Sequence, residues 1–253
     1  MGIKTLYIEY YVPKQNGEVC EERHNEQLTA LQRNLNSGAV DRIVIFTGEA
    51  LELDAPGVAK LEVVRAGRMT FQAIFDYANS QSRPDDIHIL ANNDIELVSG
   101  FQQVDRWLSP DDFFCLSRYE LNGRLSDHAH GSQDVWMWRG LNRIRHADYF
   151  MGVRGCDCHI IGDARRAHYQ VSNPSLDLHI LHHHGSELRS ASYKRLQIPS
   201  PWFGIEPSRL GRVGEVCQYD VSGAPFIILD AGGRPSRQAL RRDAAAIWNH
   251  PRG

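Results

Sequence analysis

Hydrophobic positions in the first half of the chain fall into short apolar runs that alternate with segments of helical spacing. The apolar runs are rich in β-branched and aromatic residues and lie at residues 5–12, 41–46, 60–64, 86–91 and 113–117. The intervening segments with apolar residues three and four apart, which predict helices, lie at residues 22–35, 71–78 and 98–108. Thr70 precedes the second of these segments and is suited to cap it. Strands that alternate with helices predict an α/β fold with a mostly parallel central sheet and helices on both faces.

The second half of the chain has a less regular pattern. Residues 125–202 are dense in Gly, His and aromatic side chains, which indicates loops and short elements. Beyond Pro201, apolar runs at 213–217 and 226–229 predict a hairpin, and 237–248 predicts a basic helix. We therefore predict a main domain at 1–205, with halves at 1–97 and 98–205, and a small C-terminal appendage at 206–253.

Polar residues follow the predicted strands at their carboxyl ends, where open α/β sheets bind ligands. The most informative of these turns is Asn92-Asn93-Asp94, which follows an apolar run. A carboxylate in this place can hold a divalent cation on a diphosphate, because Mg²⁺ and Mn²⁺ prefer oxygen ligands. An Asn-Asn-Asp turn is also common in ordinary loops, so the tripeptide alone leaves both interpretations open.

Residues 65–79 followed by 89–95 resemble the donor half of GT-A glycosyltransferases, in which a basic or polar turn, a helix, a strand and a DxD-type motif follow one another. The resemblance extends to 132–136, 155–157, and 173–175 with the histidines at 182–184, and so covers about residues 1–190. It implies a GT-A-like, Rossmann-like fold. It also implies transfer of a sugar from a nucleoside diphosphate sugar, with a UDP-sugar favoured, to an acceptor hydroxyl with the help of Mn²⁺ or Mg²⁺. The sequence departs from a strict DxD motif because Asn92 stands at the first acidic position.

Carried over by position, the resemblance implies a set of donor-binding residues: Glu9, Tyr10, Thr47, Arg65, Arg68, Asn92, Asn93 and Asp94. Asp94 would be the main carboxylate at the diphosphate and its cation. Arg65 and Arg68 offer planar, permanently charged donors for phosphate or for a base edge, although a solvated basic turn is an equal alternative for Arg65. Tyr10 is suited to stack on a base, but packing at the edge of the core is the commoner role of such a residue.

Two aspartates are candidates for the chemistry at the acceptor. Asp157 lies where the resemblance places the acceptor-side helix and its catalytic carboxylate, and a carboxylate there could remove the acceptor proton. A first-turn or capping role for Asp157 is the structural alternative, and the two roles are compatible. Asp134 could bind sugar hydroxyls or take a buried capping role, and whether the reaction inverts or retains configuration stays open.

Histidine is concentrated late in the chain, with five of the twelve histidines between residues 168 and 184. In an extended segment, His182 and His184 lie on one face, and the resemblance implies that one of them completes the cation site beside Asp94. Imidazoles that cap backbone groups in a polar loop are the alternative. A rival hypothesis is a zinc hydrolase in which His128 and His130 join the later cluster. A third hypothesis is a catalytically silent nucleotide-sugar-binding module, suggested by Asn92.

Composition excludes several other classes of protein. The chain has 253 residues, 42% of them hydrophobic and 23% charged, which is typical of globular proteins rather than disordered or fibrous ones. The formal charge of -3 argues against a protein that coats nucleic acid. No apolar run approaches the ~20 residues of a membrane helix, and the chain begins without a signal-peptide core, so we predict a cytoplasmic protein. The acceptor, whether a glycan, a nucleic acid or a small molecule, stays open.

Overall fold

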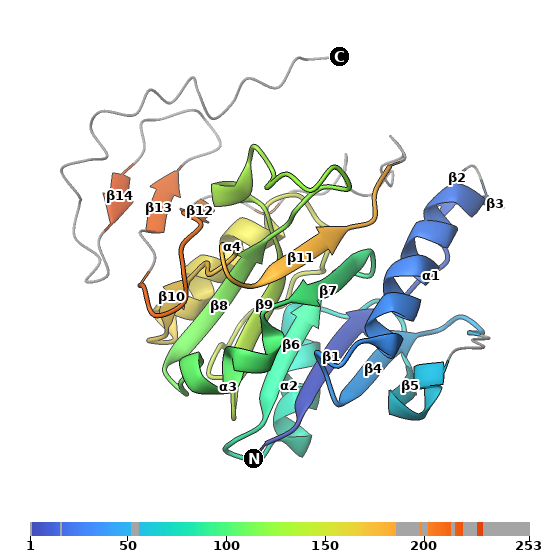
Figure 1. Cartoon of the computed structure of the whole chain (residues 1–253), viewed down its shortest axis with the longest axis horizontal. Helices are drawn as coiled ribbons and strands as arrows, with labels where there is room; N and C mark the ends of the chain where they lie inside the picture. The colour runs from blue at the N-terminus through green and yellow to red at the C-terminus, as the bar shows by residue number, and fades with distance from the viewer. Residues whose placement is uncertain are drawn as a thin grey trace.

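The computed structural model describes residues 2–15, 17–51, 56–185, 198, 202–213, 216–219 and 227–229 (Figure 1). Its centre is a seven-stranded sheet in the order β10-β8-β9-β6-β1-β4-β5. The strands are β1 (Lys4–Glu9), β4 (Arg42–Thr47), β5 (Leu61–Arg65), β6 (Ile87–Ala91), β8 (Asp112–Ser117), β9 (Gln133–Arg139) and β10 (Gln170–Ser172). The pairs β1 with β4, β1 with β6, β4 with β5 and β8 with β10 are parallel, and only β9 runs against its neighbours β6 and β8. The predicted mostly parallel α/β sheet is confirmed.

Helices cover both faces of the sheet because successive side chains of each strand point to opposite sides. The helices are α1 (Glu21–Asn36), α2 (Phe71–Gln81), α3 (Val104–Trp107) and α4 (Cys156–Arg166). Tyr7 of β1 belongs to the buried cluster that includes residues of α2 and α4. Its neighbours Leu6 and Ile8 belong to the cluster that includes residues of α1 and α3. The hydroxyl of Thr70 accepts a hydrogen bond from the Ala73 amide at 3.2 Å, which confirms its predicted role as a helix cap.

The predicted helix at 98–108 is only partly correct. Its first residues belong to a strand, β7 (Ile95–Ser99), which pairs antiparallel with β11 (His179–His182). Ile95 and Leu97 are buried alternately along this strand, and Gly100 ends it with a φ of 92°. The helical part is confined to the turn η2 (Phe101–Gln103) and to α3. The strand was missed because its alternation spans only three residues, too few to outweigh the helical spacing that follows.

The irregular second half contains more regular structure than its pattern predicts. Strand β9 lies in the middle of the sheet, and six of its seven residues are buried, so it lacks the alternation of a half-exposed strand. The predicted hairpin is confirmed as β13 (Val216–Tyr219) against β14 (Ile227–Leu229), and β12 (Trp202–Ile205) pairs with β13 on its other side. The boundary between 205 and 206 stays a prediction, and the predicted helix at 237–248 lies outside the described residues.

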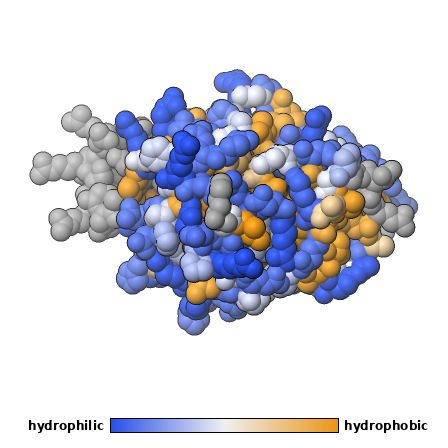
Figure 2. All heavy atoms as spheres, turned by 60° about the horizontal axis from the view of Figure 1, so that its bottom comes forward, coloured by the Kyte–Doolittle hydropathy of each residue, from blue (hydrophilic) through white to orange (hydrophobic). Residues whose placement is uncertain are grey.

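The remaining elements are short. They are β2 (Lys14–Gln15), β3 (Glu18–Val19), η1 (Pro56–Lys60) and η3 (Ala129–Gly131). Hydrophilic side chains cover most of the face in Figure 2, with hydrophobic side chains in a few patches between them. Within the described part of the chain, every helix is too short or too polar to cross a bilayer.

Candidate functional site

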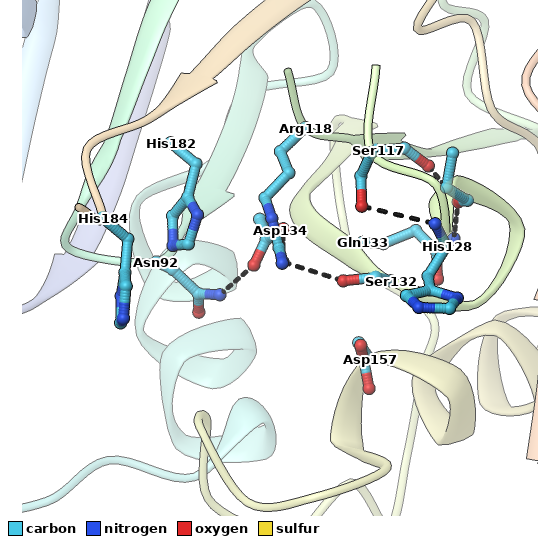
Figure 3. Close-up of polar contacts among 12 residues, drawn as sticks. Asn92, Ser117, Arg118, His128, Ser132, Gln133, Asp134, Asp157, His182 and His184 are labelled. Atoms are coloured by element: carbon cyan, nitrogen blue, oxygen red, sulfur yellow. Dashed lines mark hydrogen bonds and ion pairs between the residues drawn. The ribbon is translucent and has the colours of Figure 1, made fainter. Parts of the chain in front are cut away.

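The candidate site lies beyond the carboxyl end of β6, where the Asn92-Asn93-Asp94 turn connects β6 to β7. The turn is held on both sides by main-chain hydrogen bonds. The Asn92 amide donates to the Asp134 carbonyl at 3.0 Å, and the His183 amide donates to the Asp94 carbonyl at 2.8 Å. These contacts bring the start of β9 and the end of β11 to the turn, so the site combines residues far apart in the sequence (Figure 3).

Asp94, His182 and His184 form a compact group of possible cation ligands. One ligand atom from each lies within 4.8 Å of the others. Nε2 of His182 lies 3.1 Å from Oδ2 of Asp94, and Nδ1 of His184 lies 3.9 Å from the same oxygen. Burial opposes the charge of Asp94, but interactions with both imidazoles and with Arg23 hold its pKa well below the usual range. Burial would also lower the pKa of His182, yet hydrogen bonds to Asp94 and Glu120 raise it to about 9.

The donor set suits a divalent cation. Oδ1 of Asp94 is buried and has no hydrogen-bond partner among the described residues, and neither has Nδ1 of His184. Arg23 contacts the other oxygen of Asp94, Oδ2, so a guanidinium already neutralises part of the charge. Imidazole is a ligand for transition metals, above all Zn²⁺. Mn²⁺ is a transition metal that oxygen ligands also suit, whereas Mg²⁺ is bound by oxygen. Of the two predicted cations, the residues therefore favour Mn²⁺. A cation would compete with the proton that His182 binds.

A hydrogen-bonded network connects this turn to the start of β9 and to the segment after β8. The side-chain amide of Asn92, through Nδ2, donates to Oδ1 of Asp134 at 2.7 Å, and Nη1 of Arg118 donates to Oδ2 of Asp134 at 3.0 Å. Arg118 also donates to Ser132 at 2.8 Å and to Glu120 at 3.0 Å. The side chain of Asn92 is thus engaged with Asp134, which accounts for an amide at the first motif position: a carboxylate there would repel Asp134.

Arg118 and Glu120 are site residues that the sequence analysis missed. They follow β8 in the Ser-Arg-Tyr-Glu segment at 117–120, immediately after an apolar run. This is the same strand-end position that singled out Asn92 and Asp94. Applying the rule to the fifth predicted strand would have found them.

Asp157 lies in the first turn of α4, on the other side of the network (Figure 3). Its Oδ1 accepts a hydrogen bond from the Cys158 amide at 3.0 Å, so it does have the predicted first-turn role, although Gly155 occupies the N-cap position itself. Burial and the nearby charge of Asp134 raise the pKa of Asp157 to about 7. A carboxyl group that titrates near neutral pH is suited to exchange a proton with a substrate.

The predicted donor residues at the end of β1 form a second polar group. Oε1 of Glu9 accepts hydrogen bonds from Nε of Arg68 and from the Met69 amide, each at 2.8 Å. Burial raises the pKa of Glu9, and these two donors partly offset that effect. The guanidinium of Arg68 lies 6.0 Å from the ring centre of Tyr11 and 5.2 Å from that of Phe150. Tyr11 and Phe150 are both more than a third exposed, and neither was among the donor-binding residues expected from the sequence.

Four other predicted donor residues are engaged elsewhere or have no assigned contact. The hydroxyl of Tyr10 lies 2.6 Å from Nε2 of His24, so this buried tyrosine points to α1 rather than to a ligand surface. Thr47 accepts from the Glu49 amide, and Arg65 donates to the carbonyls of residues 48 and 49. Asn93 is buried, and its Nδ2 has no hydrogen-bond partner among the described residues.

The histidines of the rival zinc hypothesis do not form one cluster in the described part of the chain. The group of possible ligands found there contains Asp94, His182 and His184, and neither His128 nor His130 belongs to it. In Figure 3, His128 lies on the opposite side of Arg118 from His182 and His184. A zinc site that joins both pairs is therefore not formed.

Comparisons with known proteins leave the family open. No protein-family profile matches the chain, and no curated protein matches it. Among solved structures, 2-C-methyl-D-erythritol 4-phosphate cytidylyltransferase of Francisella tularensis is similar with a TM-score of 0.35 and 15% identity, over 55% of this chain and 73% of that one. Mannose-6-phosphate isomerase of Helicobacter pylori is similar with a TM-score of 0.28 and 13% identity, over 46% and 51% of the two chains. TM-scores this low do not establish a shared fold.

Proposed function

We propose that the protein transfers a sugar from a nucleoside diphosphate sugar to an acceptor hydroxyl, with a divalent cation held by Asp94, His182 and His184. The observation that carries this proposal is the arrangement at the carboxyl end of β6. A compact group of cation ligands is linked there, through Asn92 and Asp134, to a region with a carboxyl group that titrates near pH 7. Cation and base are the two functions that displacement of a diphosphate by a hydroxyl requires.

The donor would span the two polar groups of the site. The nucleoside would lie at the end of β1, where Tyr11 and Phe150 offer aromatic faces and Arg68 adds a charged, planar donor. The salt bridge to Glu9 fixes one edge of the Arg68 guanidinium. The diphosphate would lie toward Asp94. A cation bound there would neutralise the charge that develops on the departing diphosphate.

Asp157 would act on the acceptor. As the acceptor oxygen attacks the anomeric carbon, a carboxylate oxygen of Asp157 takes the hydroxyl proton, and the bond from that carbon to the diphosphate breaks. The nucleoside diphosphate leaves with the bonding electrons. Direct displacement of this kind inverts the configuration at the anomeric carbon. Asp134 is less suited to be the base, because both of its oxygens already accept hydrogen bonds from Asn92 and Arg118.

A nucleotide-sugar-binding module without turnover is the second candidate. The contact between Arg23 and Asp94 favours it, because this guanidinium already supplies a positive charge where a catalytic cation would act. Such a module would bind a donor but would not break the bond to the diphosphate.

Donor turnover separates the two candidates. Purified protein is incubated with a panel of UDP- and GDP-sugars, with Mn²⁺ or with a chelator, and the released nucleoside diphosphate is measured. Many transferases hydrolyse their donor slowly in the absence of acceptor, so release that depends on Mn²⁺ and on Asp157 supports a transferase. Tight binding of a donor without any release, also in the presence of candidate acceptors, would support the silent module.

A further inference from the structure

Glu120 lies directly beside the proposed cation site although it is not among the possible ligands. It follows β8 in a segment that pairs with β11 through the main chain. The Tyr119 amide donates to the Ile180 carbonyl and the His182 amide donates to the Tyr119 carbonyl, both at 2.9 Å. The Glu120 amide is in turn held by the Arg124 carbonyl at 2.9 Å. The backbone therefore fixes where Glu120 stands relative to His182.

The side chains continue this arrangement. Oε2 of Glu120 lies 3.4 Å from Nδ1 of His182, and Nε2 of the same imidazole lies 3.1 Å from Asp94. The other oxygen of Glu120, Oε1, accepts from Nε of Arg118 at 3.0 Å. Arg118 is itself anchored by Asp134. The Nδ1 edge of the imidazole ring therefore contacts a carboxylate whose other oxygen is held by Arg118.

We propose that Glu120 is a positioning residue for His182: it accepts the Nδ1 proton and so presents the Nε2 lone pair to a divalent cation at Asp94. This inference rests on the proposed cation site. Imidazole ligands commonly donate their second ring proton to a carboxylate, which fixes the tautomer and the ring plane and strengthens the ligand. His184 differs, because its Nδ1 has no hydrogen-bond partner among the described residues. His182 is therefore the better organised of the two nitrogen ligands.

The chain contains a matched pair for comparison. Glu96 on β7 lies 2.8 Å from Nε2 of His183, the neighbour of His182 that does not belong to the ligand group. Both pairs join an imidazole to a carboxylate next to β11, and both are partly exposed. A change at Glu96 therefore removes a similar imidazole–carboxylate contact from the neighbouring histidine, on the β7 side of β11, without touching His182.

The test is a calorimetric titration of the full chain with Mn²⁺ alone. It compares wild type with Glu120→Ala, Glu120→Gln and the control Glu96→Ala, and thermal unfolding of each variant confirms that it is folded. We expect Glu120→Ala to weaken Mn²⁺ binding by ~10–100-fold, the usual effect of removing such a partner. Glu120→Gln should lose less, because its carbonyl oxygen still accepts from Nδ1. Glu96→Ala should bind Mn²⁺ as wild type does.

The outcomes distinguish this inference from the function on which it rests. If the folded variants Glu120→Gln and Glu120→Ala both bind Mn²⁺ as tightly as wild type does, Glu120 has no positioning role. An equal loss in Glu96→Ala and Glu120→Ala would also overturn the inference, because the effect would then be general to the carboxylates that contact the end of β11. Failure of wild type to bind Mn²⁺ would overturn the cation site itself.

Discussion

Replacement of Asp157 by asparagine should make the protein more stable and much less active. The pKa of this carboxyl group is raised from 3.8 to about 7, so its ionised form lowers the free energy of unfolding. Asparagine carries no charge, has nearly the same size, and keeps an oxygen that can accept from the Cys158 amide. The variant therefore removes the electrostatic penalty while leaving the first turn of α4 intact.

The magnitude follows from the size of the shift. A rise of about three pKa units corresponds to about 4 kcal/mol at 1.36 kcal/mol per unit. Asp157 is partly exposed, so solvent screening reduces the gain to ~1–2 kcal/mol. In a protein of this length, such a gain raises the melting temperature by about 2–8 °C.

The pH dependence has a definite sign. Below pH 4 the carboxyl group is protonated in both the folded and the unfolded chain, and the variant gains nothing. Between pH 4 and pH 7 the unfolded chain loses its proton first, so wild type is progressively destabilised and the gain grows. Above pH 7 the gain is constant. Thermal unfolding of wild type and variant at pH 4.5, 6 and 8 measures this dependence.

The activity of the same variant provides a second test. If Asp157 is the base, kcat should fall by ~10²–10⁴-fold, and the wild-type rate should decline below an apparent pKa near 7. A melting temperature that falls equally at all three pH values would refute the electrostatic reasoning. A variant that keeps most of its transfer rate would refute the assignment of the base.

Three further changes test other parts of the site. Arg68→Ala should raise the KM for the donor by about tenfold or more, since a charged hydrogen bond contributes ~1.5–3 kcal/mol. Arg65→Ala should not, because the Arg65 guanidinium donates to the carbonyls of residues 48 and 49 and has no part in the proposed donor site. Equal effects in these two variants would place the nucleoside elsewhere. Asn92→Asp should move the acidic limb of the pH–rate profile to higher pH, because a second carboxylate beside Asp134 adds negative charge near Asp157 and raises the pKa of Asp157. An unchanged profile would contradict the network. His182→Ala should weaken Mn²⁺ binding more than His184→Ala does, and the opposite order in calorimetry would contradict the ligand assignment.

Five strands of the sheet, β1, β4, β5, β6 and β8, could be predicted from the sequence because they are short apolar runs that end at polar residues, whereas β9 and β10 lie in the segment predicted to be irregular. The same rule located Asp94, since ligand sites lie beyond the carboxyl ends of parallel strands. Strand β7 escaped prediction because only Ile95 and Leu97 face inward, and its hydrogen bonds go to β11 and to the Asn34 side chain, partners distant in the sequence.

The partners of the predicted site residues could not be derived from spacing. That Asn92 donates to Asp134 depends on the antiparallel pairing of β6 with β9, and that Glu120 meets His182 depends on the pairing at Tyr119. Such contacts between distant segments are fixed only when the chain is folded. Tyr10 shows the converse. It lies just beyond the end of β1, as Tyr11 does, but its hydroxyl contacts His24 of α1.

The measurement that most directly tests the account is calorimetric titration of the protein with UDP, in the presence of Mn²⁺ and in the presence of a chelator. We predict that Mn²⁺ strengthens UDP binding by more than about tenfold, a gain above ~1.4 kcal/mol. The gain should vanish in Asp94→Asn, which keeps the size of the side chain but loses the charged cation ligand, and it should persist in Arg65→Ala. Equal UDP binding with and without Mn²⁺, or no binding of UDP or GDP at all, would contradict the proposed nucleotide-sugar site.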